Sequence, residues 1–359
     1  FFCEFVRSVL LTAPAVGEDD DARAANLRRG GMKIYTTLDP ELQQSGLNAI
    51  SIVPARVDYM NLGASGVQVE VGTGRILSMV QNRPYSIENS EDPNSPTTQV
   101  NYNVRSINGG GGGHSAGSTY KVFSLVNWLE QGHSVNETVN GRVGTKKVIN
   151  CDGQTQNVVS SNSGNGIGNF EANPGYVGTV YNFTRDSLNS GFLAMAEKIS
   201  VCSTNQVAMK LGVMTGDGTP LDTTNFGYNV LGDQPVAPLD MAGAYASIAA
   251  NGMLCPAKAI DKAINAEGVD ITPQTACNRV MTEAVASTAA YTLEGVMRGT
   301  GSGARIGDGV PVFGKTGIHE YLHTWMDGSS TKVATVVWVG NVQGDALLSD
   351  YYENGYVLS

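Results

Sequence analysis

The sequence predicts a mixed α/β fold in which both ends of the chain contribute to one antiparallel sheet. Residues 66–81, GVQVEVGTGRILSMVQ, alternate apolar and polar side chains on either side of a Gly-Thr-Gly turn, a pattern typical of a β-hairpin. The middle of the 359-residue chain has apolar residues at helical spacing, and strand-like segments return after residue 310. These observations imply two strands from the hairpin and three late strands, flanked by helices and by a largely helical lobe.

The first fifty residues predict a helix, a linker and a strand followed by a second helix. FFCEFVRSVLL is apolar but is interrupted by Glu4 and Arg7, so we interpret it as an amphipathic helix and not as an anchor or a signal peptide. Residues 17–31 are charged and end in glycine, which predicts a linker. Residues 33–50 predict a short strand, a turn at Asp39-Pro40 and a helix.

The central and C-terminal segments complete the element order. A glycine run at 109–113 precedes a predicted helix at 118–132, which ends at a glycine. Residues 136–180 are rich in Gly, Asn, Ser, Thr and Val and predict loops with short strands. Further helices are predicted at 187–202, 203–213, 238–252 and 281–299, and the late strands at 310–317, 323–328 and 332–341.

The composition excludes several classes of protein. Hydrophobic residues make up 41% of the chain and charged residues 16%, which excludes wholesale disorder. With 23 Lys and Arg against 33 Asp and Glu, the net charge is −10 and no basic stripe is present, so we expect no nucleic-acid partner. No apolar run approaches the roughly 18 residues of a membrane span.

The five cysteines favour an extracytoplasmic protein with disulfides. None of them forms a CxxC pair, which argues against zinc-ribbon and thioredoxin sites. Cys255 and Cys277 flank a short loop-like stretch and are the first candidate bridge, Cys151 with Cys202 is the second, and Cys3 is left unpaired. Five buried free thiols remain the alternative.

A Ser-x-x-Lys pattern follows the glycine run. Ser118 and Lys121 lie one turn apart on a predicted helix, so the lysine amine can reach the serine hydroxyl and accept its proton. The start of a helix also offers backbone N–H groups to a developing oxyanion. The same spacing recurs at Ser329 and Lys332 in a predicted hairpin turn, where we interpret it as accidental.

Two further short motifs accompany this pattern. Lys315-Thr316-Gly317 is the only KTG of the chain and ends a predicted strand, where its cation and hydroxyl could bind a carboxylate and its glycine would admit a substrate backbone. Among several Ser-x-Asn triplets, only Ser187-Leu188-Asn189 and Ser203-Thr204-Asn205 border helices between the other motifs. We prefer the former, because the Ser203 hydroxyl can be explained as the cap of the next helix.

SxxK, SxN and KTG in this order resemble the signature of penicillin-recognising serine enzymes. Segments spread over nearly the whole chain, such as GMKIYTTLDPELQ, VEVGTGRILSMV, AGSTYKVFSLVNWLEQG and PLDMAGAYASIAANG, are similar to class A, bifunctional penicillin-binding proteins, above all those of actinobacteria. The resemblance implies the penicillin-binding protein and serine β-lactamase fold. It assigns 1–45 to a linker after a missing glycosyltransferase domain and 46–359 to the transpeptidase domain. An upstream anchor would hold the protein at the outer face of the bacterial membrane.

The resemblance also implies an activity: D,D-transpeptidation of peptidoglycan stem peptides ending in D-Ala-D-Ala, inhibited by β-lactams and needing no metal or organic cofactor. Ser118 would form the acyl-enzyme, with Lys121 as the general base. Ser187 would relay a proton to the leaving group, and Asn189 would orient Lys121 and the substrate. Lys315 and Thr316 would bind the terminal carboxylate beside Gly317, and the N–H groups of Ser118 and Ile318 would form the oxyanion hole. We expect burial and Lys315 to lower the pKa of Lys121.

One position departs from the family pattern. The residue after KTG is usually Thr or Ser, whose hydroxyl also contacts the carboxylate, and here it is Ile318. The backbone N–H is retained, so the oxyanion hole need not suffer. The missing hydroxyl predicts carboxylate recognition weaker by about 1 kcal/mol, the value of one hydrogen bond.

Other chemistries compete with this interpretation. His319, Glu320 and His323 match the HExxH motif of zinc metallopeptidases, but that motif requires a helix and here it lies between strand-like segments. Gly112 and Gly117 have P-loop spacing but lack the following lysine. A D,D-carboxypeptidase, a β-lactamase, a β-lactam sensor and an inactive scaffold share the fold. Class A β-lactamases need an ExxLN segment, which is absent between Ser187 and Lys315, so we expect slow deacylation by water.

Overall fold

A five-stranded antiparallel sheet lies at the centre of the structure, a computed structural model that describes residues 1–55, 57, 59–88, 95–164, 166–223, 227–353 and 356–357. Its α-helices are α1 (Phe2–Thr12), α2 (Asp20–Arg29), α3 (Pro40–Ile50), α4 (Lys121–Glu130), α5 (Val180–Arg185), α6 (Asn189–Met195), α7 (Val201–Lys210), α8 (Pro238–Ala249) and α9 (Glu283–Val296). Its strands are β1 (Lys33–Thr36), β2 (Asn61–Glu70), β3 (Ile76–Gln81), β4 (His114–Ser115), β5 (Thr138–Asn140), β6 (Gly144–Ile149), β7 (Thr155–Ser160), β8 (Val177–Thr179), β9 (Pro235–Val236), β10 (Met253–Leu254), β11 (Ile260–Ile264), β12 (Asn278–Arg279), β13 (Phe313–His319), β14 (His323–Ser329), β15 (Val333–Gln343), β16 (Tyr352–Glu353) and β17 (Tyr356–Val357).

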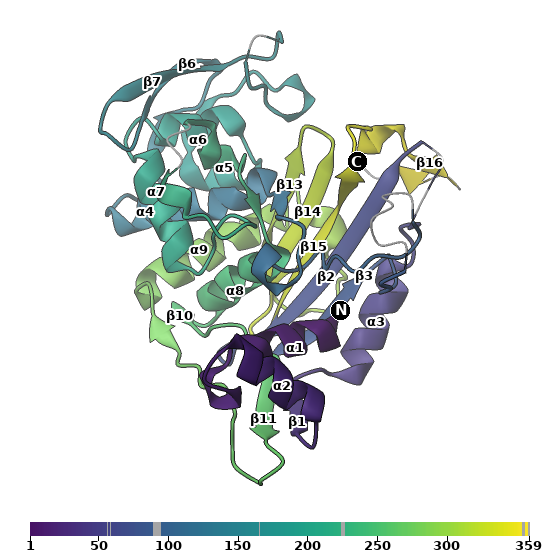
Figure 1. The fold of residues 1–359 in the computed structure, drawn as a ribbon. Helices are drawn as coiled ribbons and strands as arrows, with labels where there is room; N and C mark the ends of the chain where they lie inside the picture. The colour runs from purple at the N-terminus through teal and green to yellow at the C-terminus, as the bar shows by residue number, and fades with distance from the viewer. Residues whose placement is uncertain are drawn as a thin grey trace.

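The central sheet joins the two ends of the chain, as the sequence predicts. Its strand order is β13-β14-β15-β2-β3, so the early hairpin β2–β3 pairs with the last long strand, β15 (Figure 1). Every neighbouring pair is antiparallel. The alternation that predicts the hairpin and the late strands therefore identifies all five strands of this sheet.

The two faces of the sheet pack against different layers. On one face Val67 and Val336 are cross-strand partners and join the main core, which α8 covers. On the other face Ala64 and Val80 pack with Ile50 of α3 in a smaller cluster. Because successive residues of a strand point to opposite faces, strands buried on both sides are apolar at most positions.

A helical lobe lies beside the β13 edge of the sheet. It contains α4 to α7, with the hairpin β6–β7 at its outer end (Figure 1). Side chains of α4 from Lys121 to Trp128 are all buried, and the helix packs against α7 and α9. Helix α9 in turn contacts β13, so it fixes the lobe to the sheet.

Two predicted segments are wrong in detail. The predicted linker at 17–31 contains α2. The Asp19 side chain caps this helix by accepting a hydrogen bond from the Ala22 N–H. Acidic residues in its first turn and basic residues in its last turn also interact favourably with the helix dipole. The predicted helix at 187–202 is broken: α6 ends at Met195, and Ser200 caps a new helix, α7. The division of the chain at residue 45 remains a prediction.

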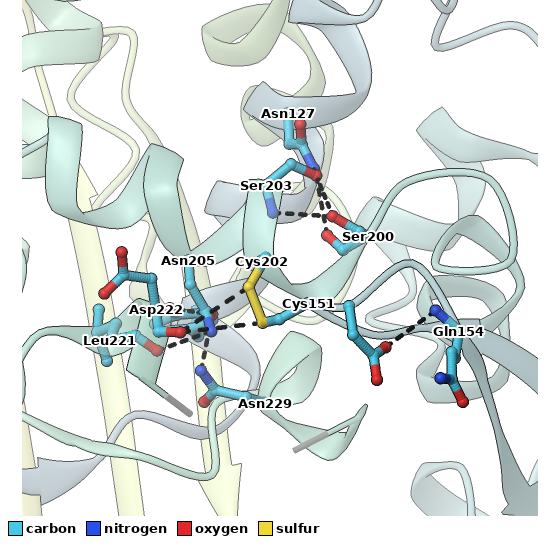
Figure 2. Close-up of a disulfide and its surroundings, with 12 residues drawn as sticks. Asn127, Cys151, Gln154, Ser200, Cys202, Ser203, Asn205, Leu221, Asp222 and Asn229 are labelled. Atoms are coloured by element: carbon cyan, nitrogen blue, oxygen red, sulfur yellow. Dashed lines mark hydrogen bonds between the residues drawn. A yellow bond between two sulfur atoms is a disulfide. The ribbon is translucent and has the colours of Figure 1, made fainter. Parts of the chain in front are cut away.

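Both candidate disulfides are present. Cys255 is joined to Cys277 and Cys151 to Cys202, whereas Cys3 is an exposed free thiol. The alternative of five buried thiols is therefore wrong. Figure 2 shows that the Cys151–Cys202 bridge ties the loop after β6 to the first turn of α7. Over the described ranges, no helix combines the length and the apolar character needed to cross a bilayer.

Candidate active site

Ser118 and Lys121 meet at the junction of two helical segments. Ser118 lies in the 3-10 turn Gly117–Tyr120, which leads directly into α4, and the Lys121 Nζ donates to the Ser118 Oγ at 2.8 Å. Gly117 has a φ of 54°, and a Cβ there would lie 2.6 Å from the Ile318 carbonyl oxygen. A glycine therefore allows the turn that carries Ser118 to contact the backbone of β13.

The preferred Ser-x-Asn triplet lies at the same site. The Lys121 Nζ donates to the Asn189 Oδ1 at 2.6 Å, to the Ser187 carbonyl oxygen at 2.8 Å and to the Ser187 Oγ at 3.3 Å. The Asn189 amide also donates to the Gly168 carbonyl oxygen at 2.7 Å. Ser187 has a φ of 53°, which is uncommon for a residue with a side chain and indicates that surrounding contacts impose its conformation.

Lys315 completes a chain of polar contacts from β13 to Ser118. Its Nζ donates to the Ser187 Oγ at 2.7 Å and to the Thr316 carbonyl oxygen at 3.0 Å. The Ser187 hydroxyl therefore lies between Lys315 and Lys121. These groups come from sequence positions almost two hundred residues apart, and the contact between lobe and sheet brings them together.

Burial changes the acidity of both lysines. It lowers the pKa of Lys121 well below its usual range, and the nearby charge of Lys315 lowers it further. Burial also lowers the pKa of Lys315 to about 7, although Asp327 opposes this effect. Within the described part of the chain, neither ammonium group forms an ion pair with a carboxylate. Lys121 therefore gives up its proton more readily than an exposed lysine does.

The three positions from Thr316 to Ile318 line up along β13. The Thr316 hydroxyl donates to the Thr300 hydroxyl at 3.2 Å. Gly317 lies on the same face as Lys315, and a Cβ on it would be 2.6 Å from the Ala116 carbonyl oxygen. That Gly317 admits a substrate backbone stays a prediction. The contact with Ala116 gives a second reason for a glycine here: it allows the turn that carries Ser118 to pack on the strand.

Two nearby residues were not predicted from the sequence. Thr300 follows α9 and contacts Thr316, and no local pattern marks it. Asp327 on β14 is fully buried opposite Lys315. Alternation in HTWMDG could have revealed it, since Trp325 and Asp327 share a face and a carboxylate on a buried strand face is rare.

The competing motifs have other geometries. His319 ends β13 and His323 begins β14, and the two are cross-strand partners in a hairpin. The helix that an HExxH site requires is therefore replaced by a turn in which Glu320 and Tyr321 have positive φ angles, so the metallopeptidase alternative is wrong in its structural premise. The glycines of the P-loop alternative lead into strand β4 and the turn that carries Ser118, without a phosphate-binding lysine.

The second Ser-x-Asn triplet belongs to a structural network. The Asn205 Oδ1 accepts hydrogen bonds from the Tyr120 hydroxyl at 3.0 Å and the Asn229 amide at 2.8 Å, next to the Cys151–Cys202 bridge (Figure 2). The prediction that Ser203 caps a helix is wrong, because Ser200 is the cap and accepts from the Ser203 N–H at 3.0 Å. The triplet therefore has a packing role.

Comparisons with known proteins agree with this geometry. The profile of the family described as "Penicillin binding protein transpeptidase domain" matches residues 64–346. Penicillin-binding protein 1A of Mycobacterium tuberculosis is 27% identical over 339 residues, which cover 89% of this chain and 37% of that protein. Penicillin-binding protein 1A of Clostridium botulinum is 25% identical over 342 residues, which cover 90% of this chain and 38% of that protein. The chain thus spans less than two-fifths of the length of these relatives.

Solved structures have the same fold. PonA1 of Mycobacterium tuberculosis in complex with penicillin V superimposes with a TM-score of 0.69 at 22% identity, over 90% of this chain and 81% of that one. The imipenem acyl-enzyme of penicillin-binding protein A from the same organism gives a TM-score of 0.67 at 20% identity, over 91% and 80% of the two chains. The predicted fold class and the resemblance to class A penicillin-binding proteins are therefore confirmed for this region. The chain belongs to the family of penicillin-binding protein transpeptidase domains, which are serine acyltransferases.

Proposed function

We propose that the chain is a D,D-transpeptidase that cross-links peptidoglycan stem peptides through an acyl-enzyme on Ser118. The observation that carries this proposal is the position of the Lys121 Nζ, which contacts the Ser118 Oγ, Asn189 and Ser187. A buried amine with a lowered pKa, within 2.8 Å of a hydroxyl, is suited to accept its proton. The geometry of the site and the family both support this reaction class.

In the first step, the Ser118 Oγ attacks the carbonyl carbon between the two D-Ala residues, and its proton passes to the Lys121 Nζ. The N–H groups of Ser118 and Ile318 stabilise the oxyanion. The close approach of the Gly117 backbone to that of Ile318 supports this role, because it brings the two segments together. The C–N bond then breaks. The leaving amine takes a proton from the Ser187 hydroxyl, which Lys121 reprotonates, so D-Ala departs as a neutral amine.

Substrate orientation falls to the β13 side of the site. Lys315 and Thr316 bind the terminal carboxylate, and the Thr300 hydroxyl, 3.2 Å from that of Thr316, lies where it can support the same contact. The Lys315 ammonium attracts the carboxylate in a buried setting, where charge interactions are strong. Ile318 contributes no hydroxyl, so we propose weaker carboxylate recognition than with Thr at this position.

In the second step, an amine of a neighbouring stem peptide attacks the ester carbonyl. Lys121, now neutral, accepts a proton from this amine, the bond from the carbonyl carbon to the Ser118 Oγ breaks, and Ser118 recovers its proton. An amide cross-link replaces the ester. With water as the acceptor, the same site would act as a D,D-carboxypeptidase, and with a β-lactam it would stall as a stable acyl-enzyme.

We also propose that the protein works outside the cytoplasm, on the outer face of the bacterial membrane. Its two disulfides support this location, because such bonds persist in oxidising compartments. The partners would be stem peptides ending in D-Ala-D-Ala and β-lactam antibiotics.

The proposal is tested by incubating the chain with a stem pentapeptide ending in D-Ala-D-Ala and a separate amine acceptor. Mass spectrometry should detect free D-Ala together with the cross-linked amide, and Ser118→Ala should produce neither. Release of D-Ala with only the hydrolysed tetrapeptide would favour the carboxypeptidase. No D-Ala release by the unaltered, folded chain would refute the proposal.

A further inference from the structure

Asp327 is a buried carboxyl group next to the site that the proposed mechanism does not use. It lies on β14 directly opposite Lys315 of β13, and opposing residues of antiparallel strands share a face. On the other side its cross-strand partner is Val336, which belongs to the apolar core. Both Asp327 and Lys315 have 0% exposure. An acid thus occupies a position at which the neighbouring strand has valine.

Neither oxygen of this carboxyl group has a hydrogen-bond partner among the described residues. The Thr119 hydroxyl faces Asp327, but it donates to the Ala116 carbonyl oxygen at 2.9 Å. Tyr245 also lies close enough to sense the charge, and its hydroxyl donates to the Thr119 carbonyl oxygen at 3.2 Å. Burying a carboxyl group without partners is costly, so packing alone does not account for an acid at this position.

The site contains two similar lysines, and a nearby acid could make their pKa values differ. Lys121 and Lys315 are both buried and both lie within hydrogen-bond distance of the Ser187 hydroxyl. The mechanism needs them in opposite states, because Lys121 must be a neutral base while Lys315 must be a cation that holds a carboxylate. Two further titratable groups, Asp327 and Tyr245, lie beside the two lysines in the described part of the chain.

The position of Asp327 favours the proton on Lys315. Burial raises the pKa of Asp327 well above its usual range, and the positive charge of Lys315 opposes that rise. A negative charge on Asp327 in turn raises the pKa of Lys315 against the effect of burial, so each group favours the charged form of the other. Burial and the positive charge of Lys315 both lower the pKa of Lys121. Strand register places the acid beside Lys315, while Lys121 enters the site from α4. Asp327 therefore acts unequally on the two amines.

We propose that Asp327 is a positioning residue of the acyl-transfer site: its buried carboxylate keeps Lys315 in the ammonium form, so that Lys121 is left as the neutral base. This inference rests on the proposed function. Asp327 contacts neither the substrate nor the reacting atoms in this scheme and acts only through Lys315.

The test is the pH profile of acylation by a fluorescent penicillin, measured on the whole chain from pH 5 to 9. Asp327→Asn and Asp327→Val both remove the charge, and the valine variant continues the apolar row of Val336. Without the carboxylate, Lys315 loses its proton at lower pH. The alkaline limb should therefore move down by at least about one pH unit, with a roughly tenfold loss at pH 8 and less than about threefold loss at acidic pH.

Two controls separate this effect from a loss of folding. Asp240→Asn changes a largely buried carboxyl group, which pairs with Arg105 away from the site, and should leave the alkaline limb in place. Because Asp327 has no hydrogen-bond partner to lose among the described residues, Asp327→Val should remain folded, which its melting temperature measures. A lower melting temperature with an unmoved alkaline limb would assign Asp327 a structural role and overturn the proposal.

The order in which the two lysines lose their protons can also be measured on the unaltered chain, without the Asp327 variants. Nitrogen NMR of labelled lysine side chains, assigned with Lys121→Arg, should show Lys315 losing its proton at higher pH than Lys121. The reverse order would overturn the proposal about Asp327. If the unaltered chain is not acylated at all, the proposed function fails, whereas acylation with unmoved limbs in both Asp327 variants contradicts only this inference.

Discussion

Two regions of the molecule contain the same Ser-x-x-Lys spacing, and only one of them brings the two side chains into contact. Ser118 and Lys121 lie on consecutive helical turns, and their side chains are 2.8 Å apart. Ser329 and Lys332 span the turn between β14 and β15, where the serine hydroxyl donates to the Ser330 carbonyl oxygen at 2.7 Å and the lysine is exposed. The Ser-x-x-Lys spacing therefore brings the hydroxyl and the amine together only on a helix.

The two Ser-x-Asn triplets differ in the same way. Ser187 and Asn189 contact the Lys121 amine, whereas Ser203 and Asn205 join α4, α7 and the disulfide region (Figure 2). In both motifs, the copy that lies in the site contacts a buried lysine amine, and in the described part of the chain the other copy does not. Each copy therefore supplies a matched control for the other.

The largest difference should appear between the two lysines. Lys121→Met removes the proposed base and should lower the rate of acylation by a fluorescent penicillin by roughly 10²- to 10⁴-fold, because general-base catalysis typically contributes that much. Lys332→Met makes the same substitution in an exposed turn and should leave the acylation rate unchanged. Equal rates for Lys121→Met and the unaltered chain would contradict the assignment of the base.

The two serines of the triplets should separate activity from stability. Ser187→Ala removes the hydroxyl between the two lysines and should slow acylation by roughly tenfold to a hundredfold, with little change in stability. Ser203→Ala removes hydrogen bonds to Ser200 and Asn127 and should cost about 1 kcal/mol of unfolding free energy with an unchanged rate. Denaturant unfolding beside acylation kinetics measures both, and a slower Ser203→Ala enzyme of normal stability would contradict the comparison.

The pH dependence of acylation should also distinguish a buried lysine from an exposed one. Because burial and Lys315 lower the pKa of Lys121, the base is already neutral well below pH 10.5, so the rate should stop rising with pH long before that value. Loss of the Lys315 proton, with a pKa of about 7, should then lower the rate on the alkaline side. A rate that still climbs between pH 9 and 10 would indicate an unperturbed base.

The smallest effect concerns Ile318. Ile318→Thr restores a hydroxyl beside the carboxylate site and should increase acylation about fivefold, equivalent to about 1 kcal/mol for one hydrogen bond. Ile318→Val retains an apolar, β-branched side chain and serves as the control, with a rate near that of the unaltered chain. An unchanged rate in Ile318→Thr would mean that Thr316 and Thr300 already satisfy the carboxylate.

Local patterns predicted the parts of the structure that depend on periodicity. Alternation identified the hairpin and the strands that carry Lys315, and helical spacing brought Ser118 to Lys121. Helix α2 was missed because it has no buried residue and depends on its Asp19 cap and on the charges at its ends. The break before α7 was missed because Ser200 interrupts an otherwise continuous helical pattern.

The rest of the site depends on tertiary contacts that no local pattern encodes. Ser187 reaches Lys315 across 128 positions of sequence, and Thr300 reaches Thr316 only because the segment after α9 returns to β13. The position of Asp327 opposite Lys315 depends on the register between β13 and β14. These contacts decide which copy of each motif lies in the site.

The central claim is that Ser118, and not its copy at Ser329, is the nucleophile. Peptide mapping by mass spectrometry after penicillin treatment tests this claim most directly, because both serines carry the same spacing to a lysine. We predict one adduct of the mass of penicillin on the peptide that contains Ser118, lost in Ser118→Ala and retained in Ser329→Ala. An adduct on any other residue, or none on the folded chain, would contradict the account.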